Sequence, residues 1–476
     1  MDSSKYITFK HSGYLIFFNG HKMTLSAFPQ KEDSFKKNKF HGHFQDEKGK
    51  SKSIHHFLTR LKNTLPTHSI QRKKKNHFQD HRPTLLRLTL NVSNICNMAC
   101  KYCYADRGTY YTSGQMMTKE TAFNAINFAS RNFSNIEHVN FFGGEPTMNE
   151  PIIRLVCEYF IYLHNQGILS HLPSFGLTTN GYDISELMFE VIKKYQFSVS
   201  VSLDGPKFIH DQLRVSKKGF VTFEAIAKNV DRLIGMGVNP EFECTYTKLH
   251  WQNGIDLKKL MDFFYERFQC RILHCPLVIT TPNSPWFIPL DVASKLYTDA
   301  INYSIENLSK HVPKSLSVAT RFLNSLVTKI PISQYCPAAK STLTINADGN
   351  VFSCFLLMHG TGYCLDNVNS DYQGLGPPDT IHTLLKMANK WQNPACQKCW
   401  AQALCFGCLG EDLVREGERI YRSSIPGKSN TCDFKRSQVQ AFLTSIVDKW
   451  LEVGQNPDFP LDVKHNIYSN KEKNPC

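Results

Sequence analysis

The sequence predicts an α/β protein built on a partial (βα)6 TIM-type barrel, followed by a loop-rich cysteine domain and preceded by a small β-ribbon. Strand-like and helix-like segments alternate from residue 84 to about residue 300, which is typical of a parallel sheet with helical crossovers, either an open barrel or a doubly wound sheet. Eight cysteines then lie between Cys336 and Cys432, where hydrophobic periodicity is weak. The 476 residues are enough for two or three domains with their own cores.

The N-terminal region differs in composition from the rest of the chain. Residues 1–90 hold 18 Lys and Arg against 6 Asp and Glu, so they carry most of the formal net charge of +14. Residues 1–29 are predicted to form a β-ribbon, because Asn19-Gly20 is a strong hairpin turn signal. The ribbon either docks a substrate peptide by strand addition or is a short ribbon with a solvated tail.

Residues 30–83 are predicted to be a basic, partly disordered linker with one weak helical stretch at 54–65. Its histidines at 41, 43, 55 and 56 are interpreted as polar linker, with weak metal binding as the alternative. The run Arg72–Lys75 lacks the interleaved aromatic residues of an RNA-binding motif, and the remainder of the chain is nearly neutral, so nucleic acid is not an expected partner.

Residues 84–300 are assigned to the barrel. Thr118 is predicted to cap the first helix, because the alanine and isoleucine positions after it recur at helical spacing. The expected strands are 85–92, 139–142, 174–178, 197–203, 241–246 and 272–279, and the expected helices are 118–129, 152–164, 184–195, 223–234, 257–268 and 290–308. Residues 301–335 are expected to bridge to the cysteine domain at 336–440, and 441–476 to form a C-terminal tail.

One predicted strand indicates a polar cavity. Residues 197–203 alternate strictly and place Ser198, Ser200 and Ser202 on one face. A buried parallel strand is normally apolar on both faces, so the serine face is expected to line a ligand site. The alternative is a solvent-facing edge strand.

A cysteine triplet follows the first barrel strand. Cys96, Cys100 and Cys103 form C-x3-C-x2-C, with Tyr102 directly before the last cysteine. Three thiolates on one loop can bind three irons of a 4Fe-4S cluster and leave the fourth iron open. Zinc requires a fourth protein ligand, which does not follow at finger-like spacing, so the spacing favours the cluster.

This triplet and the motifs after later strands resemble the signature of radical S-adenosylmethionine (SAM) enzymes. The segment Gly143-Gly-Glu-Pro146 is similar to the GGEP motif of that family, and Thr178-Thr-Asn-Gly181 and Ser202-Leu-Asp-Gly-Pro206 resemble its later strand motifs. The resemblance implies that Glu145 holds the methionine amino group, Ser202 the ribose and Arg214 the methionine carboxylate. Tyr102, Gly143 and Gly144 complete the implied cofactor-binding set.

The later cysteines resemble a SPASM domain, which carries two auxiliary clusters in peptide-modifying members of the superfamily. By that resemblance, four cysteines ligate the distal cluster: Cys396, Cys399, Cys405 and Cys432. Three ligate the nearer one: Cys336, Cys354 and Cys408. The spacing of two residues before Cys408 departs from the usual three. Residues 330–335 contain no cysteine, so the nearer cluster is expected to have an open iron that either a substrate thiolate or Cys364 completes.

Other cysteines are interpreted structurally. Cys157, Cys244 and Cys275 lie in predicted helices or strands and are expected to be core residues, whereas Cys270 and Cys476 are interpreted as incidental. Two zinc sites in the SPASM-like region are the alternative to two clusters.

The local sequences around Cys336 and Cys399 resemble maturases of ribosomally made peptides, namely the six-cysteine-peptide and quinohemoprotein amine dehydrogenase maturase groups. The resemblance covers residues 85–435 and implies three 4Fe-4S clusters, reductive cleavage of SAM to a 5′-deoxyadenosyl radical, hydrogen abstraction from a precursor peptide, and a thioether crosslink. It also implies a low-potential electron donor such as flavodoxin or ferredoxin.

Two alternatives stay open at this point. One is oxidation of a protein as in anaerobic sulfatase maturases, against which Phe355 stands where those enzymes carry an acidic general base. The other is a non-enzymatic, metal-stabilised binding protein. No signal-peptide core or membrane span is present in the sequence, so a cytoplasmic protein with no membrane partner is expected.

Overall fold

The computed structural model describes residues 6–12, 14–29, 43–45, 51–66, 82–338, 340–358, 363–370, 386, 389–408, 410, 413–416, 419–422 and 430–455. The basic run Arg72–Lys75 and Cys476 lie outside the described residues. The same holds for His41 and for the side chains of His43, His55 and His56, so the interpretation of these histidines stays a prediction.

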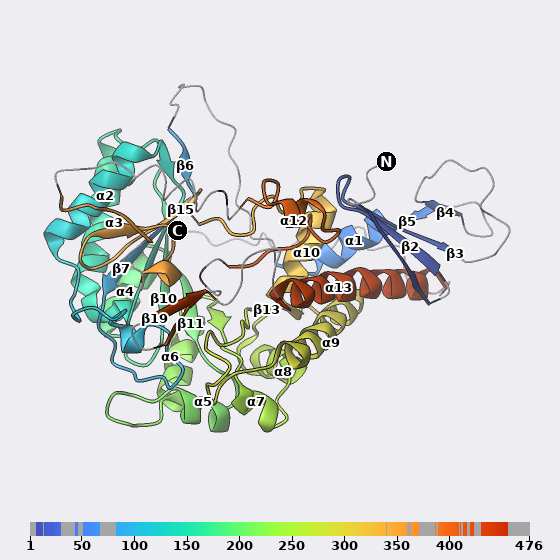
Figure 1. Cartoon of the computed structure of the whole chain (residues 1–476). Helices are drawn as coiled ribbons and strands as arrows, with labels where there is room; N and C mark the ends of the chain where they lie inside the picture. The colour runs from blue at the N-terminus through green and yellow to red at the C-terminus, as the bar shows by residue number, and fades with distance from the viewer. Residues whose placement is uncertain are drawn as a thin grey trace, which may run out of the picture.

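Five parallel strands form the core of the barrel (Figure 1). They are β7 (Arg87–Ser93), β9 (His138–Gly143), β10 (Ser174–Thr179), β11 (Ser198–Ser202) and β12 (Glu241–Glu243). Each overlaps a predicted strand, and the sheet runs in the order β12-β11-β10-β9-β7. Since parallel strands end at one edge of a sheet, the motifs that follow them meet there.

Helices cover the outer face of this sheet. They are α2 (Lys119–Asn132), α3 (Glu150–Asn165), α4 (Glu186–Lys194), α6 (Phe223–Gly235) and α8 (Leu257–Phe268), with the shorter α5 (Lys207–Leu213) and α7 (Lys248–Gln252) between them. Thr118 caps α2 as predicted, because its side chain accepts a hydrogen bond from Thr121 N at 3.1 Å. The strand residues under the helices, such as Val139, Phe141 and Val199, are buried.

The sixth strand is shorter than predicted. β13 spans only Ile272–Leu273 and pairs in parallel with β14 (Ser315–Leu316). The prediction of a strand over 272–279 is therefore wrong in extent, because Pro276 has no N–H to donate to a continuous ladder. Isolated parallel bridges from Glu243 to His274 and from Tyr246 to Leu277 still keep the segment beside β12.

The cysteine domain begins by extending the barrel sheet. β15 (Thr342–Ile345) lies parallel to β7, and β16 (Asn350–Phe352) and β17 (Cys364–Asn367) follow antiparallel, which gives one eight-stranded sheet. The first strands of the predicted loop-rich region at 336–440 are thus attached to the first barrel strand. The register places the start of β15 and the end of β16, which adjoin Cys336 and Cys354, at the beginning of β7.

The N-terminal elements pack against a helical bundle (Figure 1). β1 (Tyr6–His11), β2 (Tyr14–Asn19) and β3 (Thr24–Pro29) form an antiparallel sheet, and the predicted turn at Asn19-Gly20 follows β2. The predicted helix at 54–65 is present as α1 (Ile54–Asn63), and it packs against α9 (Leu290–Ser309), α10 (Ser317–Thr328) and α13 (Asn430–Gln455). The buried apolar side chains of α1 are Ile54, Phe57, Leu58 and Leu61.

Contacts between the two ends of the chain follow from this packing. His11 Nε2 and Asp448 Oδ2 are 2.7 Å apart, so β1 touches α13. The described ribbon therefore contacts α13 through β1, and both interpretations of the N-terminal region stay predictions. Helix α13 also runs past the boundary expected at residue 440, and Ile446 and Val447 are buried.

The remaining elements are short. They are β4 (His43–Gln45) paired with β5 (Ser51–Ser53), β6 (Thr84–Leu85) with β8 (Asn135–Ile136), β18 (Leu413–Glu416) with β19 (Arg419–Arg422), α12 (Pro394–Gln397), and the 3-10 turns η2 (Asp106–Gly108), η3 (Pro146–Asn149) and η4 (Phe355–Leu357). No helix in the described ranges is both long and apolar enough to cross a membrane.

Candidate active site and metal centres

The cysteine triplet lies on the loop after β7, as the sequence predicted. Cys96 is buried and Cys100 and Cys103 are partly buried, with Cys103 N donating to Cys100 O at 3.2 Å. Burial is the main cause that raises the pKa of the Cys96 thiol to about 12 and that of Cys100 to about 11. Thiolates in this place therefore need a positive partner, and iron supplies one.

The donor set of the triplet consists of three thiols on one loop. A 4Fe-4S cluster binds each thiolate at a different iron, so three thiols and one open iron fit such a cluster.

The two glycines after β9 allow their loop to lie directly against the cysteine loop. Gly144 N donates to Ser93 O at 2.7 Å and Glu145 N donates to Ile95 O at 2.9 Å, immediately before Cys96. A Cβ on Gly144 would lie 2.5 Å from Ile95 O, and Gly143 has a φ of +151°. The absence of a side chain at Gly144 therefore permits close approach to the backbone that carries Cys96.

The Glu145 carboxylate is fully buried and already hydrogen bonded. Its Oε1 accepts from Thr147 N, Thr147 Oγ1 and Thr179 Oγ1 at 3.1, 2.8 and 2.7 Å, and its Oε2 accepts from Asn180 N at 2.7 Å. Burial raises the pKa of Glu145, and these four donors oppose that effect. Glu145 thus joins the loops after β9 and β10, and Asn180 Nδ2 in turn donates to Cys96 Sγ at 3.7 Å.

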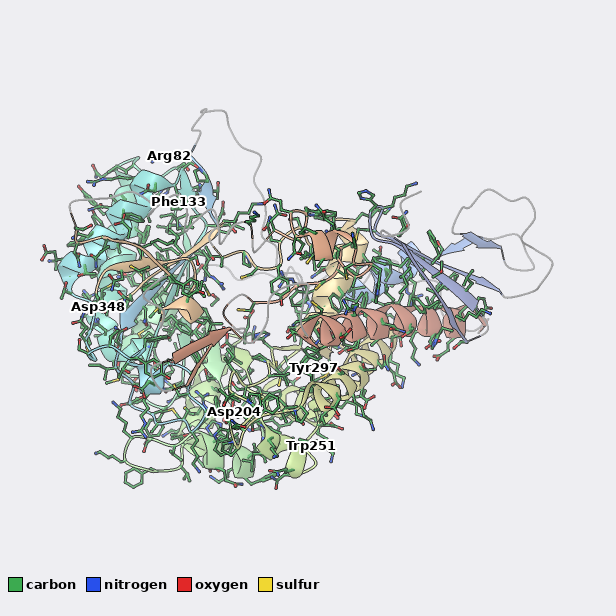
Figure 2. The ribbon with its side chains drawn as sticks, viewed as in Figure 1. Arg82, Phe133, Asp204, Trp251, Tyr297 and Asp348 are labelled. Atoms are coloured by element: carbon green, nitrogen blue, oxygen red, sulfur yellow. The ribbon has the colours of Figure 1, made fainter. Side chains whose placement is uncertain are left out.

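A buried polar network lies on the other side of the triplet. Tyr102 OH donates to Asp204 Oδ2 at 2.5 Å and accepts from Arg214 Nη1 at 2.9 Å. Asp204 is fully buried, and Figure 2 labels it in the lower part of the barrel. Arg214 is 8% exposed, and its Nε has no hydrogen-bond partner among the described residues. An unpaired, buried guanidinium N–H is what a carboxylate ligand would satisfy.

His210 lies beside this network and makes hydrogen-bond contacts with Asp204 and Thr222. Asp204 N donates to His210 Nδ1 at 3.2 Å, and His210 Nε2 lies 3.1 Å from Thr222 Oγ1, which itself donates to Arg214 O at 2.7 Å. The Thr222 hydroxyl hydrogen is used in that last bond, so His210 must carry its proton on Nε2. Burial, followed by the charges of Arg214 and Lys207, lowers the pKa of His210 to about 2.

The serine face of β11 lies inside the barrel. β11 pairs with β10 and with β12, so the edge-strand alternative is wrong. Ser200 and Ser202 are partly exposed, whereas Val199 and Val201 are buried under the helices. Ser200 lies beside Thr178, whose Oγ1 accepts from Asn140 Nδ2 at 3.4 Å, so the inner face is polar across three strands.

The division of the later cysteines into two ligand sets stays a prediction, because Cys405, expected in the distal set, packs together with Cys354 against the group that contains Cys336. Burial raises the pKa of Cys396 to about 11, and the next largest causes are Cys405, Cys432 and Cys399, so these four thiols are neighbours. Cys354 packs against Cys336. Gly407 N donates to Tyr335 O at 3.0 Å, which holds the residue before Cys408 against the residue before Cys336.

Cys364 lies differently. It is opposite Phe352 in the β16–β17 pair, and its thiol donates to Asp366 O at 3.3 Å. It packs in an aromatic group with Cys103, Tyr110 and Phe355. The three cysteines interpreted as core residues, Cys157, Cys244 and Cys275, are buried, and Cys270 Sγ donates to Ile272 O at 3.4 Å.

Several residues near these sites were not identified from the sequence. Lys390 is 1% exposed, and its Nζ donates to Gln402 O at 2.6 Å and to Cys405 O, beside the distal cysteine set. Asp204 and Asn180 belong to motifs quoted above, but their hydrogen bonds depend on residues more than 80 positions away. In the sequence, only the membership of Asp204 and Asn180 in the quoted motifs could have indicated that these two residues belong to the site.

Comparison with known proteins agrees with this geometry. Residues 90–264 match the model of the radical SAM superfamily. The uncharacterised protein MJ0907 of Methanocaldococcus jannaschii is 34% identical over 132 residues, which is 28% of this chain and 43% of that protein. The radical SAM cyclopropyl synthase TigE of Paramaledivibacter caminithermalis is 33% identical over 139 residues, which is 26% of this chain and 28% of that protein. The chain therefore spans less than half the length of these relatives.

Solved structures share the fold. The anSMEcpe structure with bound AdoMet has a TM-score of 0.62 at 18% identity and covers 77% of this chain and 100% of that one. Streptococcus suis SuiB bound to S-adenosylmethionine has a TM-score of 0.50 at 17% identity and covers 72% of this chain and 77% of that one. Radical SAM proteins use a 4Fe-4S cluster and SAM, and the buried thiols and the unpaired Arg214 Nε fit such a pair. The family match therefore covers the segment 90–264, which contains the cysteine triplet, the GGEP loop and the Tyr102–Asp204–Arg214 network.

Proposed function

We propose that this chain is a radical SAM enzyme that crosslinks a ribosomally made peptide, and that the crosslink is a thioether. The observation that carries the proposal is the meeting of three elements at one sheet edge. These are the cysteine triplet after β7, the GGEP loop after β9, and the Tyr102–Asp204–Arg214 network after β11.

Each element has a task toward the cofactors. Cys96, Cys100 and Cys103 would hold a 4Fe-4S cluster, Arg214 Nε would pair with the methionine carboxylate, and Ser202 would face the ribose. Bound together, cluster and SAM supply reductive cleavage of the sulfonium and a 5′-deoxyadenosyl radical that abstracts hydrogen. Tyr102 would position Arg214 through its hydroxyl, and Glu145 would act mainly by fixing the GGEP backbone, because its oxygens already have partners.

A peptide substrate is supported by the fold. The anSMEcpe fold was also solved with the bound peptides Kp18Cys and Cp18Cys, with TM-scores of 0.60 and 0.61. In this chain the polar inner face of β10 and β11 would receive the substrate segment, where the surrounding barrel keeps water away from the reacting atoms. The leader would add as a strand to the β1–β3 sheet, in which β1 and β3 each pair on one side only among the described strands.

The thioether is supported by the nearer cysteine set. Cys336, Cys354 and Cys408 supply three ligands, and residues 330–335 supply no fourth. A substrate thiolate could therefore bind the open iron, since Cys364 already donates within its own strand. Phe355 packs on Phe142 with ring centroids 4.4 Å apart, so the position after Cys354 offers no general base for oxidation of a thiol or alcohol.

Anaerobic reconstitution tests the proposal. The chain should bind about twelve irons, four for each of three clusters, and the Cys96, Cys100, Cys103 to alanine variant about eight. Reductant should release 5′-deoxyadenosine from the first protein and not from the variant. Zinc in place of iron, or 5′-deoxyadenosine release that survives the three substitutions, would refute it.

Co-expression with a cysteine-rich peptide from a neighbouring reading frame tests the bond. Mass spectrometry should find the loss of two hydrogens and of one free thiol per crosslink. Loss of two hydrogens with every thiol still alkylatable would indicate a carbon-carbon bond, and an unchanged mass with altered stereochemistry would indicate an epimer.

A further inference from the structure

The loop that carries the cysteine triplet is part of an exposed three-segment ribbon. Ala99 N donates to Val215 O at 2.7 Å, Lys101 N to Leu213 O at 2.9 Å and Lys217 N to Asn97 O at 2.9 Å. Val215 in turn bridges Val221. Residues 97–101, 213–217 and 219–221 therefore lie side by side at the spacing of neighbouring strands, about 4.8 Å. We call them the triplet ribbon.

The outer side chains of the triplet ribbon are cationic and apolar. Lys101, Lys217 and Lys218 are exposed, and none of the ion pairs between described residues involves them. Phe220 and Val221 are each 61% exposed, next to the lysines in the chain. The nearby Lys207 differs, because it is paired with Asp211 at 3.3 Å and with Glu224 at 3.2 Å.

This combination is unusual for its place in the chain. Most of the net positive charge belongs to residues 1–90, whereas these three unpaired lysines lie on the nearly neutral remainder. Large apolar side chains that are exposed together mark a surface that binds a partner, and the lysines beside them add a positive potential that an acidic partner would complement. Lys101 also directly follows Cys100, and their Cα atoms are about 3.8 Å apart, so a protein seated on the triplet ribbon would lie very close to the predicted cluster.

We propose that the triplet ribbon is the docking surface for an acidic, low-potential electron-transfer protein. The inference rests on the proposed function, since the triplet must hold a cluster. One electron leaves the reduced donor and enters the oxidised cluster, so the donor is oxidised by one electron, the cluster is reduced by one, and no proton moves. The unpaired lysines attract the donor, and Phe220 and Val221 form the small apolar centre that electron-transfer contacts need.

Stopped-flow reduction of the reconstituted enzyme by flavodoxin hydroquinone tests the docking surface. The rate is followed from the loss of cluster absorbance, without substrate turnover. The K101E/K217E/K218E variant should react at least about tenfold more slowly at low ionic strength, and the difference should shrink as salt rises. The K217E/K218E variant, which leaves the triplet loop unchanged, should show a smaller loss of the same kind, and F220S should weaken donor binding at all salt concentrations.

Two controls separate the possible failures. Dithionite needs no protein surface, so it should reduce all variants at the same rate; failure of dithionite to reduce any of them would count against the proposed function instead. The K193E/K228E/K295E variant changes three exposed lysines on α4, α6 and α9 and should react with flavodoxin like the unmodified chain. Equal flavodoxin rates for K101E/K217E/K218E and the unmodified chain would overturn the inference, as would self-association of the chain that F220S abolishes while its flavodoxin rate stays unchanged.

Discussion

Acidification should weaken the fold through His210. This side chain is fully buried and neutral, with Nδ1 accepting from Asp204 N and Nε2–H directed at Thr222 Oγ1. Its folded pKa is lowered to about 2, mainly by burial, whereas an unfolded histidine titrates near 6.5. The unfolded chain therefore binds the extra proton first, and the stability that His210 contributes above pH 6.5 is lost as the pH falls below it.

The magnitude follows from the two pKa values. One pH unit below 6.5 costs about 1.4 kcal/mol of unfolding free energy, because the folded state cannot take the proton in this range. Between pH 7.5 and 5.5 the loss is therefore about 1.4 kcal/mol, or roughly 3–6 °C in melting temperature for a unit of 150–250 residues. His138, whose pKa burial lowers to about 4, contributes to the measured curve as well, so the unmodified chain alone does not isolate the effect.

A variant without the titrating ring isolates it. His210→Asn keeps an acceptor near Asp204 N and loses the bond to Thr222, a contribution of about 1 kcal/mol that does not itself depend on pH. Thermal unfolding of both proteins under nitrogen should show the unmodified chain to be more stable by about 1 kcal/mol at pH 7.5. This difference should fall by about 1.4 kcal/mol by pH 5.5, so that the variant becomes slightly the more stable protein. A constant difference between the unmodified chain and His210→Asn would refute the assignment of a neutral, buried imidazole.

For three further substitutions, the contacts of the replaced side chain predict whether stability or reduction potential falls. Glu145→Gln replaces one accepting oxygen by an amide N–H group, which would then face hydrogen-bond donors such as Thr179 Oγ1 and Asn180 N. Thermal unfolding should show that the free energy of unfolding falls by about 1–3 kcal/mol, whereas the exposed Glu190→Gln should leave it unchanged. Asp211→Ala removes the carboxylate that accepts from Thr222 N and Phe223 N at the start of α6, and should cost about 1 kcal/mol in chemical denaturation, most of which Asp211→Asn should restore. Lys390→Met removes a buried cation beside the distal cysteines, so an EPR-monitored redox titration should find a lower reduction potential for the cluster that they are predicted to hold. Lys390→Arg keeps the charge and should keep the potential. An unchanged potential in Lys390→Met with full iron content would contradict the expected effect.

The barrel could be predicted from local pattern because its strands and helices obey it closely. The apolar spacing of α2, its Thr118 cap and the alternation in β11 each depend on neighbours in the sequence, and each prediction is confirmed. The predicted extent of the sixth strand was wrong, and the reason is also local, because Pro276 interrupts a segment that is otherwise largely apolar. The central parallel sheet and its order follow from such units with few further assumptions.

Long-range pairing could not be predicted in the same way. Nothing in residues 342–345 indicates that they pair with β7, more than 250 positions earlier, because β15 resembles any short apolar strand. The contact of His11 with Asp448 and the burial of α1 are likewise properties of packing between distant segments. For the candidate site, the motif positions were predicted, but the internal hydrogen bonds of Glu145 and Asp204 were not.

These internal bonds change how loss of activity should be interpreted. Glu145 fixes the GGEP loop, Asp204 engages Tyr102, and His210 supports both ends of the segment from Asp204 to Arg214. A substitution at any of them displaces the backbone or side chains next to the triplet, so lost SAM cleavage alone would not establish contact with SAM. The iron content of each variant separates contact with SAM from support of the cluster loop. Removal of a side chain that contacts SAM should leave iron binding intact, whereas removal of a side chain that supports the loop should reduce both iron binding and SAM cleavage.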